Sequence, residues 1–372
     1  MDANRRVVRT LVSKLSSVSE KTRIESLIEL RQLSKQDPST RPIIAESGAI
    51  PYLAETLYSS LHPSQENATA TLLNLSITEK EPIMSTRGVL DALAHVISHH
   101  SSTSAAAAVQ SAAATIHSLL SSVDDYRTVV GSKREIVYAL VDILRCHRSS
   151  PPRTVKDSLK ALFAIALHPL NRATMVQFGV VPALFSLIVN DGRVGIVEDA
   201  SAVIAQVITI FDSTHIYRNV YRKKKLNLIK CSFELSYILV AGCEESVEAF
   251  KKVSGVGVLA DLLDLATGSS MRTRENAVSA LLNLVRCGGD VVAGDVRDAV
   301  AFGAMDGIAD VKDKGSVKGQ SKAMELMRVM VGDVRSHGDV RSQGDVRNHG
   351  NVGLNSDSSF GSYMNEDSGT SF

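Results

Sequence analysis

Residues 66–77 read ENATATLLNLSI, and residues 275–286 read ENAVSALLNLVR. In both stretches the third, seventh and tenth residues are apolar, which is helical spacing for a single buried stripe. Six such segments occur, and their starts lie 44, 46, 42, 77 and 44 residues apart. The other four are QSAAATIHSLLS from Gln110, KDSLKALFAIAL from Lys156, EDASAVIAQV from Glu198 and GQSKAMELMRVM from Gly319. The last segment carries Glu325 and Arg328 at two of the apolar positions, as a terminal capping repeat does.

A second phrase precedes most of these segments. It reads GAIPYLAETL from Gly48, GVLDALAHVI from Gly88, GVVPALFSLI from Gly179 and SGVGVLADLL from Ser254. Glycine suits the left-handed conformation that ends a helix, and proline is tolerated in the first turn of the next one. Short helices such as STRPIIAES, residues 39–47, lie upstream of the phrase. Each unit is therefore predicted to contain a short helix, a glycine corner, a second helix, a loop and a long third helix.

A period of 42–46 residues with three helices is typical of armadillo repeats, whereas tetratricopeptide and ankyrin repeats are shorter. One unit cannot bury its apolar stripe alone, so neighbouring units stack. We predict an all-α, right-handed armadillo-repeat solenoid over residues 1–331, whose first 35 residues form a capping helix pair. GAIPYLAETL and ENATATLLNLSI resemble the armadillo halves of plant U-box ubiquitin ligases and their armadillo-only relatives, a resemblance that covers roughly residues 5–331.

The repeat breaks in two places. The 77-residue spacing places an excess at residues 208–240, which lack Gly and Pro and hold three of the eight Tyr. This atypical insert has two open explanations: a retained intron or gene-model artefact, or a genuine looped-out insertion. From residue 332 the chain reads GDVRSH, GDVRSQ and GDVRNH, and then becomes rich in Ser, Gly and Asn. So few large apolar residues cannot offset the entropy of ordering, and we predict a disordered low-complexity tail over 332–372.

Polar residues flank the apolar stripe of the long helices. Asn67 and Asn74 are seven residues apart, so they lie two turns along one face, and Asn276 and Asn283 repeat this arrangement. The family resemblance implies that third helices line a concave groove, where an Asn at the LLNL position binds the backbone of an extended peptide. The predicted partner-binding residues are Asn67, Asn74, Ser111, Ser118, Asp157, Asp199, Gln206, Asn276 and Asn283. Ala164 occupies an equivalent position without a polar side chain, which interrupts the row at its centre.

Composition restricts the partners. Lys and Arg number 41 against 40 Asp and Glu, a net charge of +1 that argues against nucleic-acid binding. No stretch reaches 18 uncharged apolar residues, so we expect no membrane span. Four Cys without a CxxC pair, and no secretory segment, favour a reducing compartment, that is the cytoplasm, the nucleus or both.

No catalytic, cofactor-binding or metal-binding constellation stands out, and we expect no enzyme activity. His99 and His100 border a loop rich in Ser and Ala, where solvated side chains are the expectation. Family members with ligase activity carry a U-box upstream of the repeats, and the sequence shows no such segment.

The most direct interpretation is a protein-binding scaffold that takes a protein or an extended peptide in its groove. The family resemblance implies a link to ubiquitin-dependent signalling in plants. One alternative is the substrate-binding fragment of a U-box ligase. Another is a nuclear-transport adaptor, which the absence of Trp disfavours, because the importin-type pairing of Trp with Asn is missing.

Overall fold

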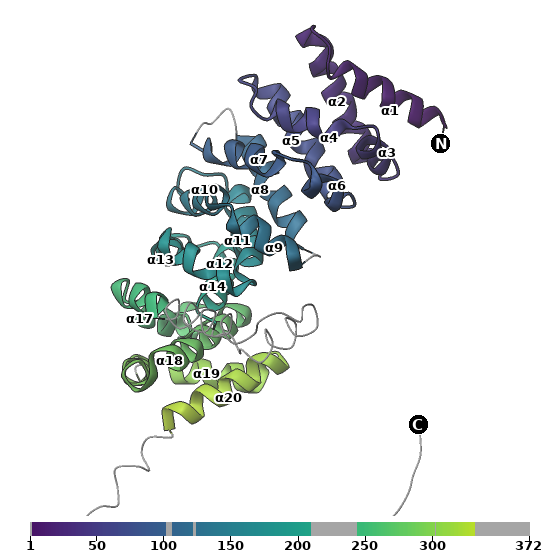
Figure 1. The fold of residues 1–372 in the computed structure, drawn as a ribbon. Coiled ribbons are helices and arrows are strands. Elements are labelled where there is room, and N and C mark those ends of the chain that lie inside the picture. The colour runs from purple at the N-terminus through teal and green to yellow at the C-terminus, as the bar shows by residue number, and fades with distance from the viewer. Residues whose placement is uncertain (1, 102–105, 122–123, 210–243, 302, 332–372) are drawn as a thin grey trace, which may run out of the picture. The chain divides into compact units, whose positions relative to one another are not determined.

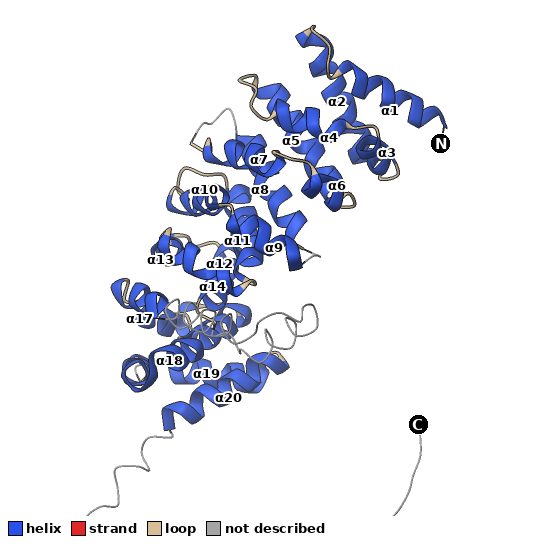
Figure 2. Cartoon of the chain, viewed as in Figure 1, coloured by secondary structure: helices blue, strands red, loops and turns tan. Residues whose placement is uncertain are grey.

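The computed structural model describes residues 2–101, 106–121, 124–209, 244–301 and 303–331. Within these ranges every regular element is a helix, and none is a strand (Figure 2). The predicted all-α solenoid is confirmed: short, medium and long helices follow one another and stack along one direction (Figure 1).

The chain begins with a pair of helices, α1 (Asp2–Lys14) and α2 (Glu20–Gln36), as predicted for the cap. The Ser19 side chain accepts a hydrogen bond from the backbone N–H of Thr22, which satisfies one of the unpaired donors at the start of α2. Val8 and Leu11 of α1 are buried, and α1 packs on α2 and on the next helix. This pair therefore covers the apolar end of the first repeat.

Four complete repeats follow. Their helices are α3 (Thr40–Glu46), α4 (Ala49–Thr56) and α5 (His62–Ser76); α6 (Lys80–Ser85), α7 (Val89–Ser98) and α8 (Ala106–Leu120); α9 (Asp124–Ser132), α10 (Arg134–Arg145) and α11 (Pro152–Ala166); and α12 (Pro169–Gln177), α13 (Val180–Asn190) and α14 (Val194–Val207).

The fifth and sixth repeats share one long helix. After a helix over residues 244–252 come α17 (Gly255–Asp261), the short η2 (Leu265–Thr267), α18 (Met271–Val300), α19 (Ala304–Lys314) and α20 (Val317–Val331). Gly289 (φ 60°, ψ −149°) interrupts the helical backbone inside α18. The part before Gly289 is the third helix of the fifth repeat, and the part after it is the first helix of the sixth.

The predicted apolar stripes are buried in the repeats quoted for them. Ala68, Leu72 and Leu75 are fully buried, and the equivalent residues of α8, α14 and α18 are at most 3% exposed. The predicted register of the sixth copy is wrong. Gly319, Ala323 and Leu326 form its buried stripe, so the template begins at Val317, two residues earlier than predicted. Glu325 and Arg328 then fall outside the stripe, and no departure from the repeat remains to be explained.

The glycine corners are also confirmed, with one correction. Gly48, Gly88 and Gly179 adopt left-handed backbone angles (φ 79°, 86° and 73°) directly before the second helix of their repeats. In the fifth repeat the left-handed position falls on Ser254 (φ 52°), and Gly255 is already the first residue of α17. This backbone conformation costs a residue with a side chain about 1–2 kcal/mol.

The atypical segment 208–240 lies outside the described residues except for Ile208 and Thr209, and the tail 332–372 lies outside them entirely. α14 ends at Val207, and Ile208 is 2% exposed. The Thr209 carbonyl accepts a hydrogen bond from Arg172, and its hydroxyl accepts one from Asn283. Both residues are therefore part of the packed fourth repeat.

In the part of the chain that the structure describes, one helix, α18, is long and apolar enough to cross a membrane by length and composition alone. Its backbone is broken at Gly289, and 61% of the apolar window is buried inside the fold. The packing of the solenoid thus accounts for the apolar character of α18.

Candidate protein-binding groove

The long third helices form a continuous row. α2 packs on α5, α5 on α8, α8 on α11, α11 on α14, and α14 on α18. The exposed side of this row forms one surface that extends along the stacked repeats. The candidate partner-binding residues predicted from the sequence all belong to these helices.

A hollow of about 470 Å³ lies at the centre of the row. Its middle strip comes from α11 and the residue that caps its C-terminus: Lys156, Lys160, Phe163 and the C-cap Leu167 follow one another at helical spacing. Ala164 and Ala202 also line it, and their short side chains leave room between neighbouring helices. The hollow therefore lies where the predicted row of polar residues is interrupted by Ala164.

The rim of the hollow carries more cations than anions. Its charged residues are Arg127, Lys156, Lys160 and Arg272 against Glu198 and Asp199. Lys160 and Arg272 are exposed, and neither makes a hydrogen bond or ion pair with another residue in the part of the chain that the structure describes. In contrast, the Glu198 carboxylate accepts a hydrogen bond from the Ser270 hydroxyl at 2.6 Å, and Arg127 pairs with Asp124. Two cations thus remain available to a ligand in the hollow.

Asp199 is an incompletely satisfied carboxylate in this wall. Its side chain is 16% exposed, and its Oδ2 is buried without a hydrogen bond, 3.9 Å from the Lys156 ammonium nitrogen. Burial raises the pKa of Asp199 above its ordinary 3.8, and the attraction of Lys156 opposes this shift only in part.

His117 lies on the opposite wall. Burial lowers its pKa below the ordinary 6.5, and the positive charge of Lys160 lowers it further. The imidazole is therefore neutral at pH 7 and serves as a hydrogen-bonding group rather than a third cation.

Of the nine predicted residues, Asp199 lines the hollow and the other eight do not. Four of those eight connect one third helix to the one before it. Asn74 donates to the Ser34 hydroxyl at 3.0 Å, Ser118 to the Ser76 carbonyl at 3.0 Å, and Gln206 to the Ala166 carbonyl at 3.5 Å. Asn283 donates to the carbonyl of Ala205 and to the hydroxyl of Thr209, both at 3.2 Å.

These bonds satisfy polar groups near helix C-termini, where backbone carbonyls have no partner within their own helix. Asn283 is only 3% exposed, so its amide is committed to the interior of the stack. Asn74 is half-buried, and both of its hydrogen bonds use the amide nitrogen, which leaves its oxygen as the group open to a ligand. Direct contact of these residues with a peptide stays a prediction.

The remaining predicted residues lie two turns earlier on their long helices, seven residues before Asn74, Ser118, Ala164 and Asn283. Asn67 accepts from Arg31 at 3.1 Å, Asp157 accepts from Gln110 at 3.2 Å, and Asn276 donates to Ser201 at 3.0 Å. Ser111 is half-buried on α8. All except Ser111 therefore bridge consecutive repeats, as Asp199 does through Lys156.

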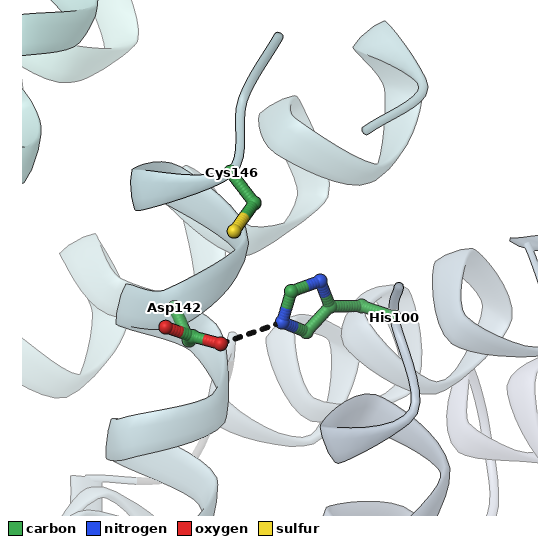
Figure 3. A group of neighbouring side chains, drawn as sticks. All are labelled: His100, Asp142 and Cys146. Atoms are coloured by element: carbon green, nitrogen blue, oxygen red, sulfur yellow. Dashed lines mark hydrogen bonds and ion pairs between the residues drawn. The ribbon is translucent and has the colours of Figure 1, made fainter. Parts of the chain in front are cut away.

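A second group of polar residues, His100, Asp142 and Cys146, joins the second repeat to the third (Figure 3). His100 follows α7, and its Nε2 is 2.8 Å from an Asp142 oxygen on α10, while Cys146 ends that helix. The His100 side chain is 6% exposed, so the expectation of a solvated histidine is wrong. One ligand atom from each of the three residues lies within 4.8 Å of the other two, which makes this group a candidate metal site.

Comparison with known proteins agrees with the repeat architecture. Two solved structures share the fold. One is an engineered protein, with a TM-score of 0.55 and 20% identity, and the match covers 75% of this chain and 97% of that one. The other is from a study of the interaction between cadherin and β-catenin, with a TM-score of 0.52 and 15% identity, and the match covers 88% of this chain and 64% of that one.

Curated relatives are plant proteins. U-box domain-containing protein 16 of Arabidopsis thaliana is 29% identical over 87% of this chain and 40% of its own length, and protein 17 is 30% identical over 88% and 39%. The chain thus spans about two fifths of the length of these relatives. The family model described as the plant U-box protein ARM repeat region matches residues 7–209, which is more than half of the chain. Three-helix repeats, stacked third helices and this match together place the chain in the family of plant U-box protein armadillo-repeat regions.

Proposed function

We propose that this chain is a scaffold that binds an extended segment of a partner protein in the groove over α8, α11 and α14. The observation that carries the proposal is the hollow itself, with Lys160 and Arg272 uncommitted on its rim. Hydrogen-bonding groups and an apolar strip that includes Phe163 lie between the charges. This combination fits a polypeptide that brings acidic side chains to the rim and apolar ones to the floor.

The partner belongs, in this proposal, to ubiquitin-dependent signalling. The support is the similarity to U-box domain-containing proteins of Arabidopsis, of which the chain spans about two fifths. Substrate recognition as part of a U-box ligase is the alternative that the same similarity supports. In both cases the groove selects the protein, and ubiquitin transfer depends on a U-box.

A nuclear-transport adaptor is the weaker candidate. Import signals are rich in Lys and Arg, and the rim of this groove has an excess of cations that would repel them. We propose that the protein acts in the cytoplasm, the nucleus or both. Imaging of a fluorescent fusion in plant cells tests this, because a fusion found in neither compartment would contradict it.

Proximity labelling in plant cells tests the function. The double variant Lys160→Glu and Arg272→Glu reverses the two free charges of the rim. Lys21→Glu on α2 is the control: it reverses one exposed charge at a residue that does not line the hollow and that lies 4.0 Å from Glu25. We expect a set of partners that the wild type and Lys21→Glu label and the double variant does not, enriched in proteins of the ubiquitin pathway.

Each partner is then confirmed with purified protein and a synthetic peptide from its sequence. If the double variant labels the same partners as the wild type, the groove is not the recognition surface. If groove-dependent partners are found but their lifetime in cells is independent of this chain, the link to ubiquitin is wrong and the scaffold function stands.

A further inference from the structure

The side chains of Asp142 and Cys146 share one face of α10. The Cys146 N–H donates to the Asp142 carbonyl at 3.0 Å, which is the helical bond over four residues. Residues four apart lie one above the other on a helix, and this spacing lets two side chains bind the same metal ion. His100 approaches this face from the preceding repeat (Figure 3).

Three different metal-ligating groups therefore meet at one point. A nitrogen, a sulfur and a carboxylate oxygen lie within 4.8 Å of one another. In a tetrahedral zinc site with bonds of about 2.0–2.3 Å, neighbouring ligand atoms are roughly 3.3–3.8 Å apart. Side-chain movements on the order of 1 Å would bring the three atoms to those separations.

The surroundings leave the ligand atoms accessible to an ion. The two carboxylate oxygens of Asp142 have different partners: Oδ2 is 2.8 Å from His100 Nε2, and Oδ1 accepts a hydrogen bond from Arg145 at 3.5 Å. Cys146 is half-buried and free. With His100 Nε2 bonded to Asp142, the second ring nitrogen, Nδ1, is buried without a partner, so the metal-free group is not a complete hydrogen-bond network.

We propose that His100, Asp142 and Cys146 bind one Zn²⁺ ion, with water as the fourth ligand, and that the ion joins the second repeat to the third. Mixed nitrogen, sulfur and oxygen coordination is what Zn²⁺ accepts, whereas Mg²⁺ and Ca²⁺ require oxygen ligands. Binding replaces the Cys146 S–H proton, which leaves to solvent, and the metal takes the lone pair of one imidazole nitrogen of neutral His100.

The test is a zinc titration of reduced, chelator-treated full-length protein, in competition with a chromogenic chelator. The wild type is expected to bind one equivalent at this site, with a higher thermal midpoint. His100→Gln, Asp142→Asn and Cys146→Ser each remove one of three protein ligands and are expected to weaken this binding at least about tenfold. Circular dichroism verifies that each variant retains the helical content of the wild type.

Co²⁺ provides a second readout, because a bound thiolate gives a near-ultraviolet charge-transfer band that nitrogen and oxygen ligands do not. This band is expected in the wild type and absent in Cys146→Ser, although three other Cys remain in the chain.

His99→Gln is the control. His99 is exposed and directly precedes His100. His99 and His95 lie one helical turn apart with their rings in contact, and this pair is the competing site for a metal. Unchanged zinc binding in His99→Gln supports the proposal. The proposal is overturned by failure of the wild type to bind zinc, by unchanged binding in Cys146→Ser, or by an equal loss in His99→Gln.

Discussion

The Asn283 side chain donates a hydrogen bond to the Ala205 carbonyl at 3.2 Å, although 78 residues separate the two. The equivalent bond from Ser118 to Ser76 spans 42 residues, which is one repeat. Asn276 and Glu198 are likewise bonded across 78 residues. α14 and α18 are therefore direct neighbours in the stack, in spite of the extra sequence between them.

Replacement of Asn283 by Ala should reduce stability. Asn283 is 3% exposed, and its loss leaves the carbonyl of Ala205 and the hydroxyl of Thr209 without their donor. We expect the free energy of unfolding to fall by about 1–3 kcal/mol, measured by urea denaturation. Asn190→Ala, at an exposed position, is the comparison and should change it by less than about 0.5 kcal/mol. Equal effects of the two substitutions would show that the bond between α18 and α14 has no special role.

The extra sequence itself should be removable after Thr209. A variant that lacks residues 210–240 keeps Ile208, which is buried in the fourth repeat, and Thr209, which accepts hydrogen bonds from Arg172 and Asn283. A variant that lacks 208–240 loses them. We expect the first to be more stable than the second by about 1–3 kcal/mol, because a buried apolar side chain and hydrogen-bond acceptors are retained.

Thermal unfolding of both deletion variants and of the full chain measures this difference. A full chain that is stable while neither deletion variant folds would mean that the inserted residues are part of the fold, contrary to the explanation as a gene-model artefact.

Ser254→Gly should stabilise the fifth repeat. Ser254 holds the left-handed corner that glycine holds in three other repeats. Glycine adopts this conformation freely, at the cost of a more flexible unfolded chain, so a net gain of about 0.5–1 kcal/mol is expected. Ser47→Gly tests the explanation, because Ser47 has φ −76° and precedes a corner that is already glycine. There the substitution should stabilise nothing, and a similar gain at both positions would contradict the role of backbone strain.

Asp199→Asn should stabilise the protein at neutral pH. Burial raises the pKa of Asp199, so the folded state holds the proton more tightly than the unfolded state does. The wild type therefore loses stability as pH rises from about 3.8 through the raised pKa, and the loss is constant above it. Urea denaturation from pH 3 to pH 8 should show the variant and the wild type converging at the acid end. A difference independent of pH would assign the effect to packing, and a variant less stable than the wild type at neutral pH would show that the attraction of Lys156 outweighs the cost of burial.

Sequence predicted the solenoid well because the solenoid depends on local spacing. The positions of Leu72 and Leu75, and the corners at Gly48 and Gly179, follow from helical periodicity and from the left-handed backbone angle. The sixth repeat was placed two residues out of register because Gly319 and Ala323 give a weak apolar signal. The corner at Ser254 was missed because a serine gives no signal for a left-handed residue.

The candidate site was harder to predict, because availability depends on pairing between repeats. Asn283 and Asn74 occupy the LLNL position predicted to bind a peptide, but their side-chain amides donate hydrogen bonds to the neighbouring helix. Lys160 lies one turn before Ala164, the LLNL-equivalent position of α11, and no sequence pattern shows that its charge has no partner among the described residues. His100 and Asp142 are 42 residues apart, one repeat, and a search for polar residues at that separation would have found them.

The central claim is that the groove over α11 recognises a polypeptide through Lys160 and Arg272. The most direct test is fluorescence anisotropy with labelled peptides of about 15 residues. The peptides have the same apolar content but are acidic, neutral or basic. Each is titrated with the wild type, with the Lys160→Glu and Arg272→Glu double variant, and with Lys21→Glu. We predict that the acidic peptide binds the wild type and Lys21→Glu with equal affinity, and the double variant at least about tenfold more weakly. Equal affinity of the acidic peptide for all three proteins, or preference of the wild type for the basic peptide, would contradict the account.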